Sequence, residues 1–243
     1  MAGTYSYRIG SRDVDVSSRA RVCAVGDLVL QAAGDDADML GFGIGDLNTD
    51  GASWVLSRMA MEIRRLPALG ETVDIYTWVS DYGRLFTTRN MVLTDGEESE
   101  IAAAVTQWAM IDLSTRRPLD LSALSNKGTS LVDRQPPIEM PHKIGGGDSL
   151  MEHPYTVVYS DIDFNGHVNS MKYLEWMIDS LPPGVAENFS SLRLDLNYLH
   201  EARPGDALTI CRADDPGGAC HFDIKNSDGA SICRAIIDNK RTI

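Results

Sequence analysis

Residues 161–168 read D-I-D-F-N-G-H-V, and residues 13–20 read D-V-D-V-S-S-R-A. The two segments match at a constant offset of 148 residues (161 minus 13). A later pair, Gly70-Glu71 and Gly205-Asp206, matches at an offset of 135 (205 minus 70). These matches indicate an internal duplication, in which the first copy is 13 residues longer than the second (148 minus 135).

An amphipathic helix is expected behind each copy of this segment, because apolar residues recur there at spacings of three and four. They are Val22, Val25, Leu28, Val29 and Ala32 in the first copy, and Met171, Leu174, Met177, Ile178 and Leu181 in the second. We predict that the first helix ends near Gly34, which suits a left-handed cap. The second should end near Pro182-Pro183, because proline cannot continue a helix. The extra length of the first copy is assigned to an extended loop at residues 34–50, which are rich in Gly and Asp.

Strand-like sequence follows each helix, with Val, Ile, Thr and aromatic residues concentrated between turn signals such as Asp95-Gly96 and Asp228-Gly229. The predicted strands are 54–63, 72–80, 85–93 and 101–111, then 192–198, 207–213, 219–226 and 231–239. Each copy is therefore expected to be α+β: a short strand, one long helix, and an antiparallel sheet that wraps the helix. Two such domains would pack as a pseudo-dimer and cover each other's sheet edges. A single domain is the alternative.

Between the copies, residues 122–154 contain Pro136-Pro137, Pro141 and Gly145-Gly146-Gly147 with little periodicity. This composition is typical of a linker. We therefore expect an N-terminal domain at residues 1–121, an interdomain linker at 122–154, and a C-terminal domain at 155–243.

The composition excludes several classes of protein. Apolar residues make up 43% of the chain, yet no run approaches the roughly 18 to 20 apolar residues of a membrane helix. With no signal-peptide pattern at the N-terminus, we predict a cytoplasmic protein without membrane association. The net charge of -13 argues against nucleic-acid binding. The cysteines (Cys23, Cys211, Cys220 and Cys233) form no C-x-x-C pair and the histidines show no metal-binding spacing, so we expect reduced thiols, no metal and no cofactor.

Asp163, Asn165 and His167 stand at alternate positions just before the second predicted helix. In an extended segment, alternate side chains point to the same side, so a carboxylate, an amide and an imidazole would converge where the helix start offers backbone N–H donors. Acyl chemistry uses such groups. The same residues also suit a helix cap with an Asx turn, in which the side chains bind backbone N–H groups.

These residues resemble the acyl-ACP thioesterases, a family of two tandem hotdog domains, each a long helix wrapped by an antiparallel sheet. The family's D-x-N-x-H-V-N-x-x-K-Y-x-x-W run is matched by Asp163, Asn165, His167, Val168, Asn169, Lys172, Tyr173 and Trp176. T-W-V-S at 77–80, T-Q-W-A-M at 106–110 and S-T-R-R-P at 114–118 are similar landmarks in the first copy. The resemblance implies hydrolysis of fatty acyl thioesters on acyl carrier protein, in fatty acid biosynthesis.

The resemblance also implies that Glu201, in N-Y-L-H-E-A-R-P-G-D, is catalytic together with Asp163, Asn165 and His167. Plant members have a cysteine after this glutamate, whereas this chain has Ala202. The chemistry is therefore expected to run without a thiol nucleophile. Plant members also carry a plastid transit peptide, and the lack of one here suggests a bacterial-type protein.

The expected reaction is attack by water on the thioester carbonyl, with Asp163 or Glu201 as the base. His167 would orient that base or protonate the sulfur, and backbone N–H groups near Val168 and Asn169 would stabilise the oxyanion. Attack by Asp163 itself, through an anhydride, is the alternative.

The first copy has Ser17, Arg19 and Leu66 where the second has Asn165, His167 and Glu201. We therefore predict that the first copy is non-catalytic, and the resemblance implies that it holds the acyl chain.

An acidic carrier protein could dock only on a local basic patch of this acidic chain, for which Arg64-Arg65 and Arg116-Arg117 are the candidates. Hydrolysis of acyl-CoA and a non-catalytic acyl-binding role are the rival functions. The oligomeric state stays open, with a homodimer as one option.

Overall fold

The computed structural model describes residues 2–123, 131–147, 151–182, 184–186, 189 and 191–239. It divides into two compact units, Met1–Pro141 and His142–Ile243. Each unit holds one copy of the duplicated sequence. The division falls within residues 122–154, of which 124–130 and 148–150 lie outside the described residues.

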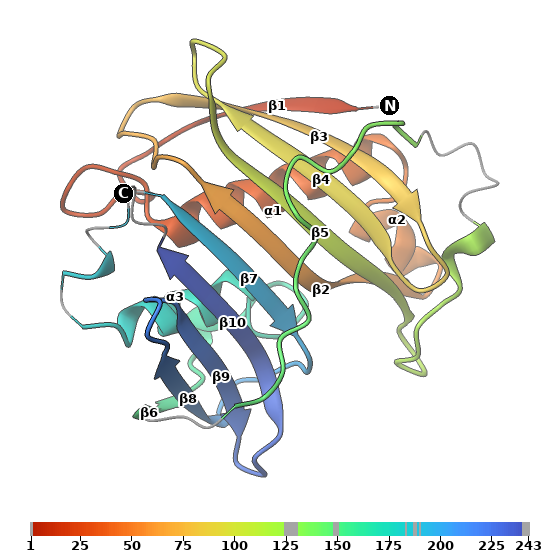
Figure 1. The fold of residues 1–243 in the computed structure, drawn as a ribbon. Helices are drawn as coiled ribbons and strands as arrows, with labels where there is room; N and C mark the ends of the chain where they lie inside the picture. The colour runs from red at the N-terminus through yellow and green to blue at the C-terminus, as the bar shows by residue number, and fades with distance from the viewer. Residues whose placement is uncertain are drawn as a thin grey trace. The chain divides into compact units, whose positions relative to one another are not determined.

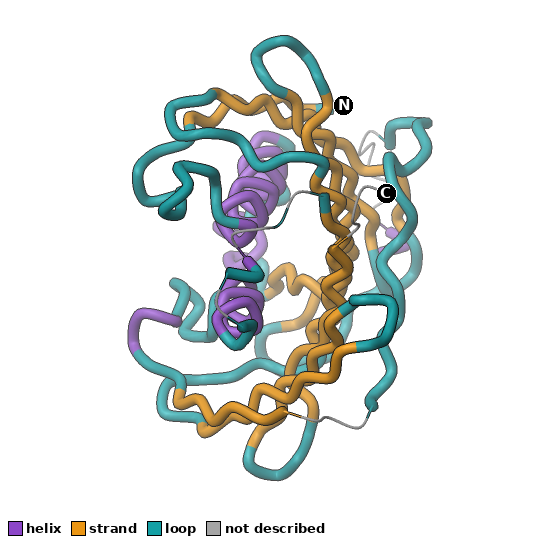
Figure 2. The backbone as a smooth tube through the Cα atoms, turned by 60° about the vertical axis from the view of Figure 1, so that its left-hand side comes forward, coloured by secondary structure: helices purple, strands orange, loops and turns teal. Residues whose placement is uncertain are grey.

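The N-terminal unit combines an antiparallel sheet with one long helix (Figure 1). Its strands lie in the order β1-β3-β4-β5-β2 and are β1 (Gly3–Arg8), β2 (Ala52–Ile63), β3 (Thr72–Tyr82), β4 (Thr87–Thr94) and β5 (Glu100–Asp112). Its helices are α1 (Val22–Met39), the short α2 (Ile44–Thr49) and a 3-10 turn, η1 (Leu121–Ala123). Figure 2 shows α1 on one face of the strands of its own unit.

The C-terminal unit repeats this arrangement. It contains β6 (Met151–Thr156), the 3-10 turn η2 (Tyr159–Asp161), α3 (Ser170–Asp179), β7 (Leu192–Tyr198), β8 (Ala207–Asp214), β9 (Cys220–Asn226) and β10 (Ser231–Asn239). The strand order β6-β8-β9-β10-β7 reproduces β1-β3-β4-β5-β2 strand for strand. The predicted α+β layout of each copy is confirmed.

The predicted strands are all present, and their ends differ from the prediction by at most two residues. Strand β6 begins at Met151, inside the predicted linker. It pairs with β8 at the edge of the sheet, where Pro154 is tolerated although it lacks a backbone N–H. At the β4–β5 turn the left-handed residue is Glu98, with φ of +61°, and not Gly96. This turn is held by Asp95, whose Oδ1 accepts the Ser99 N–H at 2.9 Å.

The predicted end of the first helix at Gly34 is wrong, because α1 continues to Met39. Asp36, in its last turns, is buried and bonds Arg89 of β4, so a tertiary contact holds the helix past the glycine. The glycine cap is Gly41, with φ of +72°. There the Phe42 N–H donates to the Ala37 carbonyl at 2.9 Å, as in a Schellman motif.

The extra length of the first copy is helical, so the prediction of an extended loop at residues 34–50 is wrong. Helix α1 has 18 residues and α3 has 10, and α2 adds 6 more. Leu47 of α2 is buried against Ala52, Met110 and Leu121, and this packing fixes the segment on the ends of β2 and β5.

Helix α3 ends at Asp179, as predicted from the prolines that follow; Pro183 itself lies outside the described residues. The carbonyl of Ser180, after the last turn, accepts a hydrogen bond from Nη1 of buried Arg212 at 2.8 Å. An arginine at this end satisfies a carbonyl that the helix leaves open.

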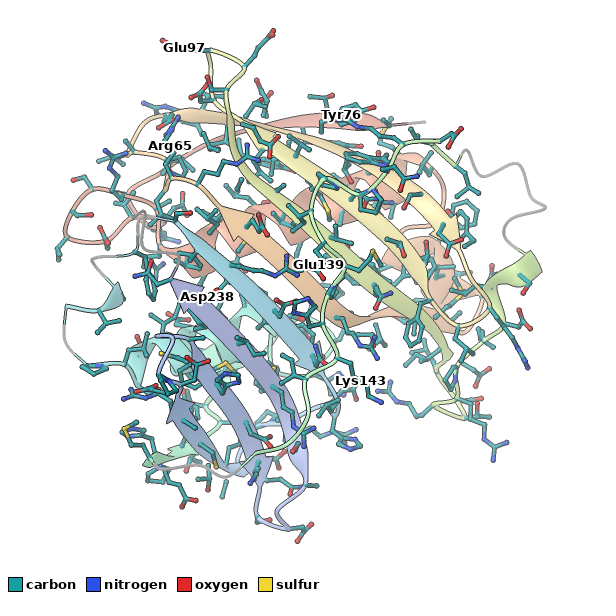
Figure 3. The ribbon with its side chains drawn as sticks, in the orientation of Figure 1. Arg65, Tyr76, Glu97, Glu139, Lys143 and Asp238 are labelled. Atoms are coloured by element: carbon teal, nitrogen blue, oxygen red, sulfur yellow. The ribbon has the colours of Figure 1, made fainter. Side chains whose placement is uncertain are left out.

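The segment between the copies is bound to the protein on both sides of Pro141. In the N-terminal unit, Val132 donates to the Val79 carbonyl at 3.0 Å, and the Arg134 guanidinium lies 4.5 Å from the centre of the Trp78 ring. In the C-terminal unit, the Ile144 N–H donates to Asn197 Oδ1 at 2.9 Å. Glu139 and Lys143 mark the two parts in Figure 3.

Candidate active site

The D-x-N-G-H motif forms a tight turn just before α3. The Asp163 N–H donates to the His167 carbonyl at 2.8 Å, and Ile162 pairs with Val168 in an antiparallel bridge. Gly166 has φ of +79°, a left-handed conformation that glycine adopts at little cost. The prediction of an extended segment with alternating side chains is therefore wrong, because the glycine reverses the chain.

Asp163 holds this turn through its side chain. Its Oδ1 accepts the backbone N–H of Asn165 at 2.8 Å and that of His167 at 3.3 Å. This arrangement is the Asx turn that the sequence left as the alternative. The Asn165 side chain is exposed, so its amide is accessible to a ligand.

The first copy contains the same turn. Oδ1 of Asp15 accepts the N–H of Ser17 at 2.8 Å and that of Arg19 at 3.4 Å, and the Asp15 N–H donates to the Arg19 carbonyl at 2.9 Å. Ser18 takes the place of Gly166 and is also left-handed, with φ of +59°. These pairs are 148 residues apart, so the offset read from the sequence is confirmed in three dimensions.

The second offset is confirmed by a bond that ties each turn to the segment ahead of the next strand. The Val168 N–H donates to the Ala202 carbonyl at 3.0 Å, and the Ala20 N–H donates to the Pro67 carbonyl at 2.8 Å. Ala202 and Pro67 are 135 residues apart (202 minus 67). The turn in the second copy is therefore bonded to the residue after Glu201, and the turn in the first copy is bonded to the residue after Leu66.

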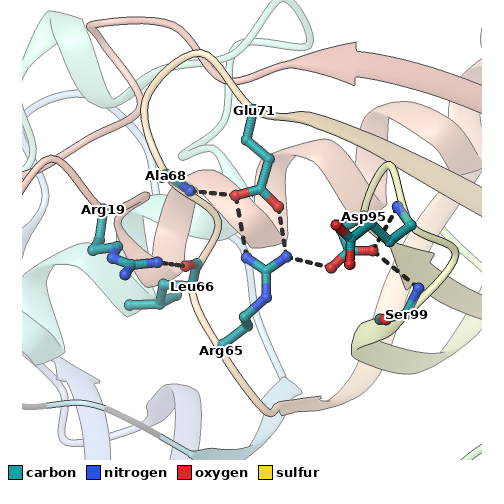
Figure 4. Close-up of polar contacts among 8 residues, drawn as sticks. Arg19, Arg65, Leu66, Ala68, Glu71, Asp95 and Ser99 are labelled. Atoms are coloured by element: carbon teal, nitrogen blue, oxygen red, sulfur yellow. Dashed lines mark hydrogen bonds and ion pairs between the residues drawn. The ribbon is translucent and has the colours of Figure 1, made fainter.

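His167 and Glu201 are brought together by this frame, with Nε2 of the imidazole 3.1 Å from Oε2 of the carboxylate. The side chains are 19% and 34% exposed, so the pair is partly shielded yet open to a reactant. In the first copy, Arg19 and Leu66 also meet, but through Nη1 of the arginine and the leucine carbonyl, at 3.2 Å (Figure 4). The same frame thus carries an acid-base pair in one copy and no acid-base pair in the other.

Backbone donors expected near the start of α3 are occupied. The Val168 N–H bonds Ala202, and the Asn169 N–H donates to the Asp161 carbonyl at 2.8 Å. Asn169 caps the helix by accepting the Met171 N–H at 2.8 Å. The fold already uses the Val168 and Asn169 N–H groups, so the predicted stabilisation of an oxyanion by backbone donors near these residues does not come from these two groups and stays a prediction for the others at the helix start.

Tyr173 lies next to the pair; it matched the family's motif run, but no role was predicted for it. Its hydroxyl oxygen accepts the backbone N–H of Ala202 at 3.2 Å. The ring is 3% exposed and packs edge-on against Trp176 and Tyr198, with centroids 5.3 and 6.2 Å away. Burial raises the pKa of Tyr173, so the phenol stays protonated at neutral pH.

The cysteines of the chain carry free thiols. Burial raises the pKa of Cys220 to about 11 and raises that of Cys233 as well, which suppresses the reactive thiolate. Within the described ranges, no three His, Cys, Asp or Glu residues lie so that they could hold a metal ion. No helix in that part of the chain is long and apolar enough to cross a membrane.

Arg65, one of the candidate docking residues, is bound within its own unit. Its Nη2 lies 2.6 Å from Oε1 of Glu71 and 2.6 Å from Oδ2 of Asp95 (Figure 4). The hydrogen bonds from Arg65 hold the pKa of Glu71 below its usual value. Two carboxylates therefore neutralise this guanidinium.

The other candidate arginines are more accessible. Arg64 is 57% exposed and pairs with Glu100 at 2.9 Å. Arg116 and Arg117 follow β5 and are both exposed. Both residues of the second pair are thus in the exposed class, whereas Arg65 is only partly exposed.

A helix against an antiparallel sheet, with the same strand order in both copies, defines a tandem hotdog protein. The profile of the acyl-ACP thioesterase N-terminal domain matches residues 3–123, and that of the C-terminal domain matches residues 147–241. The chain belongs to the acyl-ACP thioesterase family, and the predicted resemblance is confirmed.

Individual relatives agree with this placement. An acyl-ACP thioesterase from Bacteroides thetaiotaomicron is 34% identical, with a TM-score of 0.85 over 98% of this chain and 97% of that one. The chloroplastic acyl-(acyl-carrier-protein) hydrolase FATB3 of Cuphea viscosissima is 33% identical over 67% of this chain and 41% of its own length. The chloroplastic oleoyl-acyl carrier protein thioesterase 1 of Arabidopsis thaliana is 26% identical over 84% of this chain and 60% of its own. The chain thus spans about half the length of these two plant relatives.

Proposed function

We propose that this protein hydrolyses the thioester between a fatty acyl chain and acyl carrier protein and releases the free fatty acid. Family membership supports the reaction class. The observation that carries the proposal is the contact between His167 and Glu201 at 3.1 Å, which the duplicated frame replaces with Arg19 and Leu66 in the other copy. A carboxylate in contact with an imidazole supplies both a base and an acid.

Glu201 accepts a proton from the attacking water in this reaction. The water oxygen bonds to the thioester carbonyl carbon, the carbon–sulfur bond breaks, and His167 delivers a proton to the leaving sulfur. The proton that Glu201 took from water then passes to His167 across their 3.1 Å contact, which restores both groups. The products are the fatty acid and the carrier thiol, so one water is consumed for each thioester.

Asp163 and Asn165 take supporting roles. Oδ1 of Asp163 is engaged by two backbone N–H groups, and Asp15 makes the same bonds in the copy without the acid-base pair. We therefore assign Asp163 to holding the turn that presents His167. The exposed amide of Asn165 is assigned to the thioester carbonyl oxygen, where a side-chain donor stabilises the developing charge.

The two domains have different roles in the proposed reaction. The C-terminal domain, predicted at residues 155–243 and extended by β6 to Met151, is catalytic because it carries the pair. The N-terminal domain, residues 1–121, holds the acyl chain, and its Arg19 and Leu66 leave it without acid-base groups at the equivalent place. The protein acts in the cytoplasm on carrier-bound chains.

The test is the rate of fatty acid release from an acyl carrier protein thioester by the wild type and by His167→Ala and Glu201→Gln. We expect each substitution to lower kcat by at least about a hundredfold, the usual effect of removing acid-base participation. The matched control is His221→Ala, because His221 also contacts a carboxylate, Asp215, at 3.3 Å, but on an exposed surface. The control should keep the wild-type rate.

Two outcomes contradict the proposal. If the same acyl chain on coenzyme A is hydrolysed faster than on the carrier protein, the carrier is misassigned. If the thioester decays equally with and without the protein, the chain is an acyl-binding module and not an enzyme.

A further inference from the structure

The hydrogen bond between Tyr173 and Ala202 has no counterpart in the first copy. The offset of 148 places Val25 at the position of Tyr173, and the offset of 135 places Pro67 at that of Ala202. Valine has no polar group in its side chain, and proline has no backbone N–H. Acceptor and donor are therefore both missing from the copy that also lacks the imidazole and the carboxylate.

The fold of the turn does not depend on this bond. In the first copy, the Ala20 N–H reaches the Pro67 carbonyl at 2.8 Å, as the Val168 N–H reaches that of Ala202 at 3.0 Å. Val25 is 1% exposed, so an apolar side chain fills the position of the phenol. The hydroxyl of Tyr173 is therefore not needed for the fold of the turn, and its role belongs to the copy that carries His167 and Glu201.

The bond acts on the peptide unit next to Glu201. The N–H that Tyr173 holds belongs to the peptide bond joining Glu201 to Ala202, and this unit is planar. Ala202 is fully buried, and its carbonyl is held by Val168. The N–H of Ala202 is therefore held by α3, and its carbonyl is held by the motif that carries His167.

We infer that Tyr173 is a positioning residue, whose hydroxyl fixes the peptide unit after Glu201 so that the carboxylate stays within hydrogen-bond reach of His167. The inference rests on the proposed function of that pair. Tyr173 acts through Glu201 and touches no reacting atom, so it sets the rate of the chemical step and not the binding of the acyl chain.

The first variant is Tyr173→Phe, which removes the acceptor and keeps the buried ring. A misplacement of about 1 Å can cost up to about a hundredfold in rate, so we expect kcat to fall by about tenfold with KM within about twofold. The matched control is Tyr155→Phe, which loses a hydroxyl that donates to buried Asp161 at 3.0 Å. It should lose comparable thermal stability and keep kcat.

The second variant is Ala202→Pro, which removes the donor and copies the residue that the first copy already accommodates at this place. We expect a fall in kcat at least as large as that of Tyr173→Phe. The double variant should be no slower than the slower single variant, because both substitutions break one bond.

The most discriminating experiment introduces Tyr173→Phe into the Glu201→Gln variant. Because Tyr173 acts through the carboxylate, it should cause no further loss of kcat there. Equal losses in the two backgrounds, or a wild-type kcat in Tyr173→Phe while Glu201→Gln is impaired, would overturn the inference. If Glu201→Gln itself keeps the wild-type rate, the proposed site fails and the inference fails with it.

Discussion

Asp163 and Asp15 make the same hydrogen bonds in the two copies, so comparing them separates a structural role from a chemical one. Both accept the N–H groups two and four residues later, yet only Asp163 stands beside a histidine that contacts a glutamate. An interaction that both copies share belongs to the turn. The differences, His167 for Arg19 and Glu201 for Leu66, are the ones on which the proposed reaction rests.

This distinction predicts how Asp163 responds to substitution. Asp163→Asn keeps an oxygen acceptor for the turn, so kcat should stay within about tenfold of the wild type, whereas Asp163→Ala should lose at least about a hundredfold through the misplaced imidazole. Steady-state rates with one acyl chain provide the measurement, and circular dichroism should show that both variants fold.

A nucleophilic Asp163 would behave differently. Asp163→Asn would then be as inactive as Asp163→Ala, and a single turnover in water labelled with heavy oxygen would place label in the Asp163 carboxylate. We expect the label in the fatty acid alone.

The candidate site residues could be selected from the sequence because their spacing is specific, but their geometry could not be predicted. Alternating polar residues are compatible with a strand or with a turn, and the left-handed φ of Gly166 selects the turn. The occupied N–H groups of Val168 and Asn169 depend on Ala202 and Asp161, which local pattern cannot place. Tyr173 would have been found by comparing the copies, since Val25 and Pro67 differ together.

Among the elements, the strands were predicted to within two residues because alternation and turn chemistry are local signals. The end of helix α1 was not predicted correctly, since its last turns depend on the buried contact between Asp36 and Arg89, which are 53 residues apart. A glycine inside a helix costs only about 1 kcal/mol, and this tertiary contact outweighs it.

The buried pair that fixes α1 should be costly to break. Arg89→Met leaves Asp36 buried without its cation, so we expect the free energy of unfolding to fall by about 3 to 5 kcal/mol. Arg64→Met, which removes an exposed partner of Glu100, should cost at most about 1 kcal/mol. Urea denaturation compares the two, and equal losses would show that the Asp36 contact does not hold the helix.

Substitution of the left-handed residue should change the stability of the protein in opposite directions for the two turns. A Cβ added at Gly166 meets nothing within 4 Å, so Gly166→Ala should cost only the backbone strain of about 1 to 2 kcal/mol. Ser18→Gly should stabilise its turn by relieving the same strain. Thermal unfolding midpoints that move in the same direction for both variants would contradict the shared geometry.

At the scale of the whole molecule, the chain carries a net charge of -13, so an acidic carrier protein needs a local basic surface. Arg117→Glu should raise KM for the carrier-bound thioester more than for a small soluble thioester, because it alters only the encounter with the carrier. Arg65 is a poor choice, since its removal also breaks the contacts with Glu71 and Asp95. An equal rise in KM for both substrates would place the docking surface elsewhere.

Duplication followed by loss of the reactive groups from one copy is the central claim, and one measurement tests it most directly. The single-turnover rate of fatty acid release from an acyl carrier protein thioester is compared for the wild type, His167→Ala and Arg19→Ala. We predict a loss of at least about a hundredfold for His167→Ala and a rate within about threefold of the wild type for Arg19→Ala. Equal losses in the two variants, or a wild-type rate in His167→Ala, would contradict it.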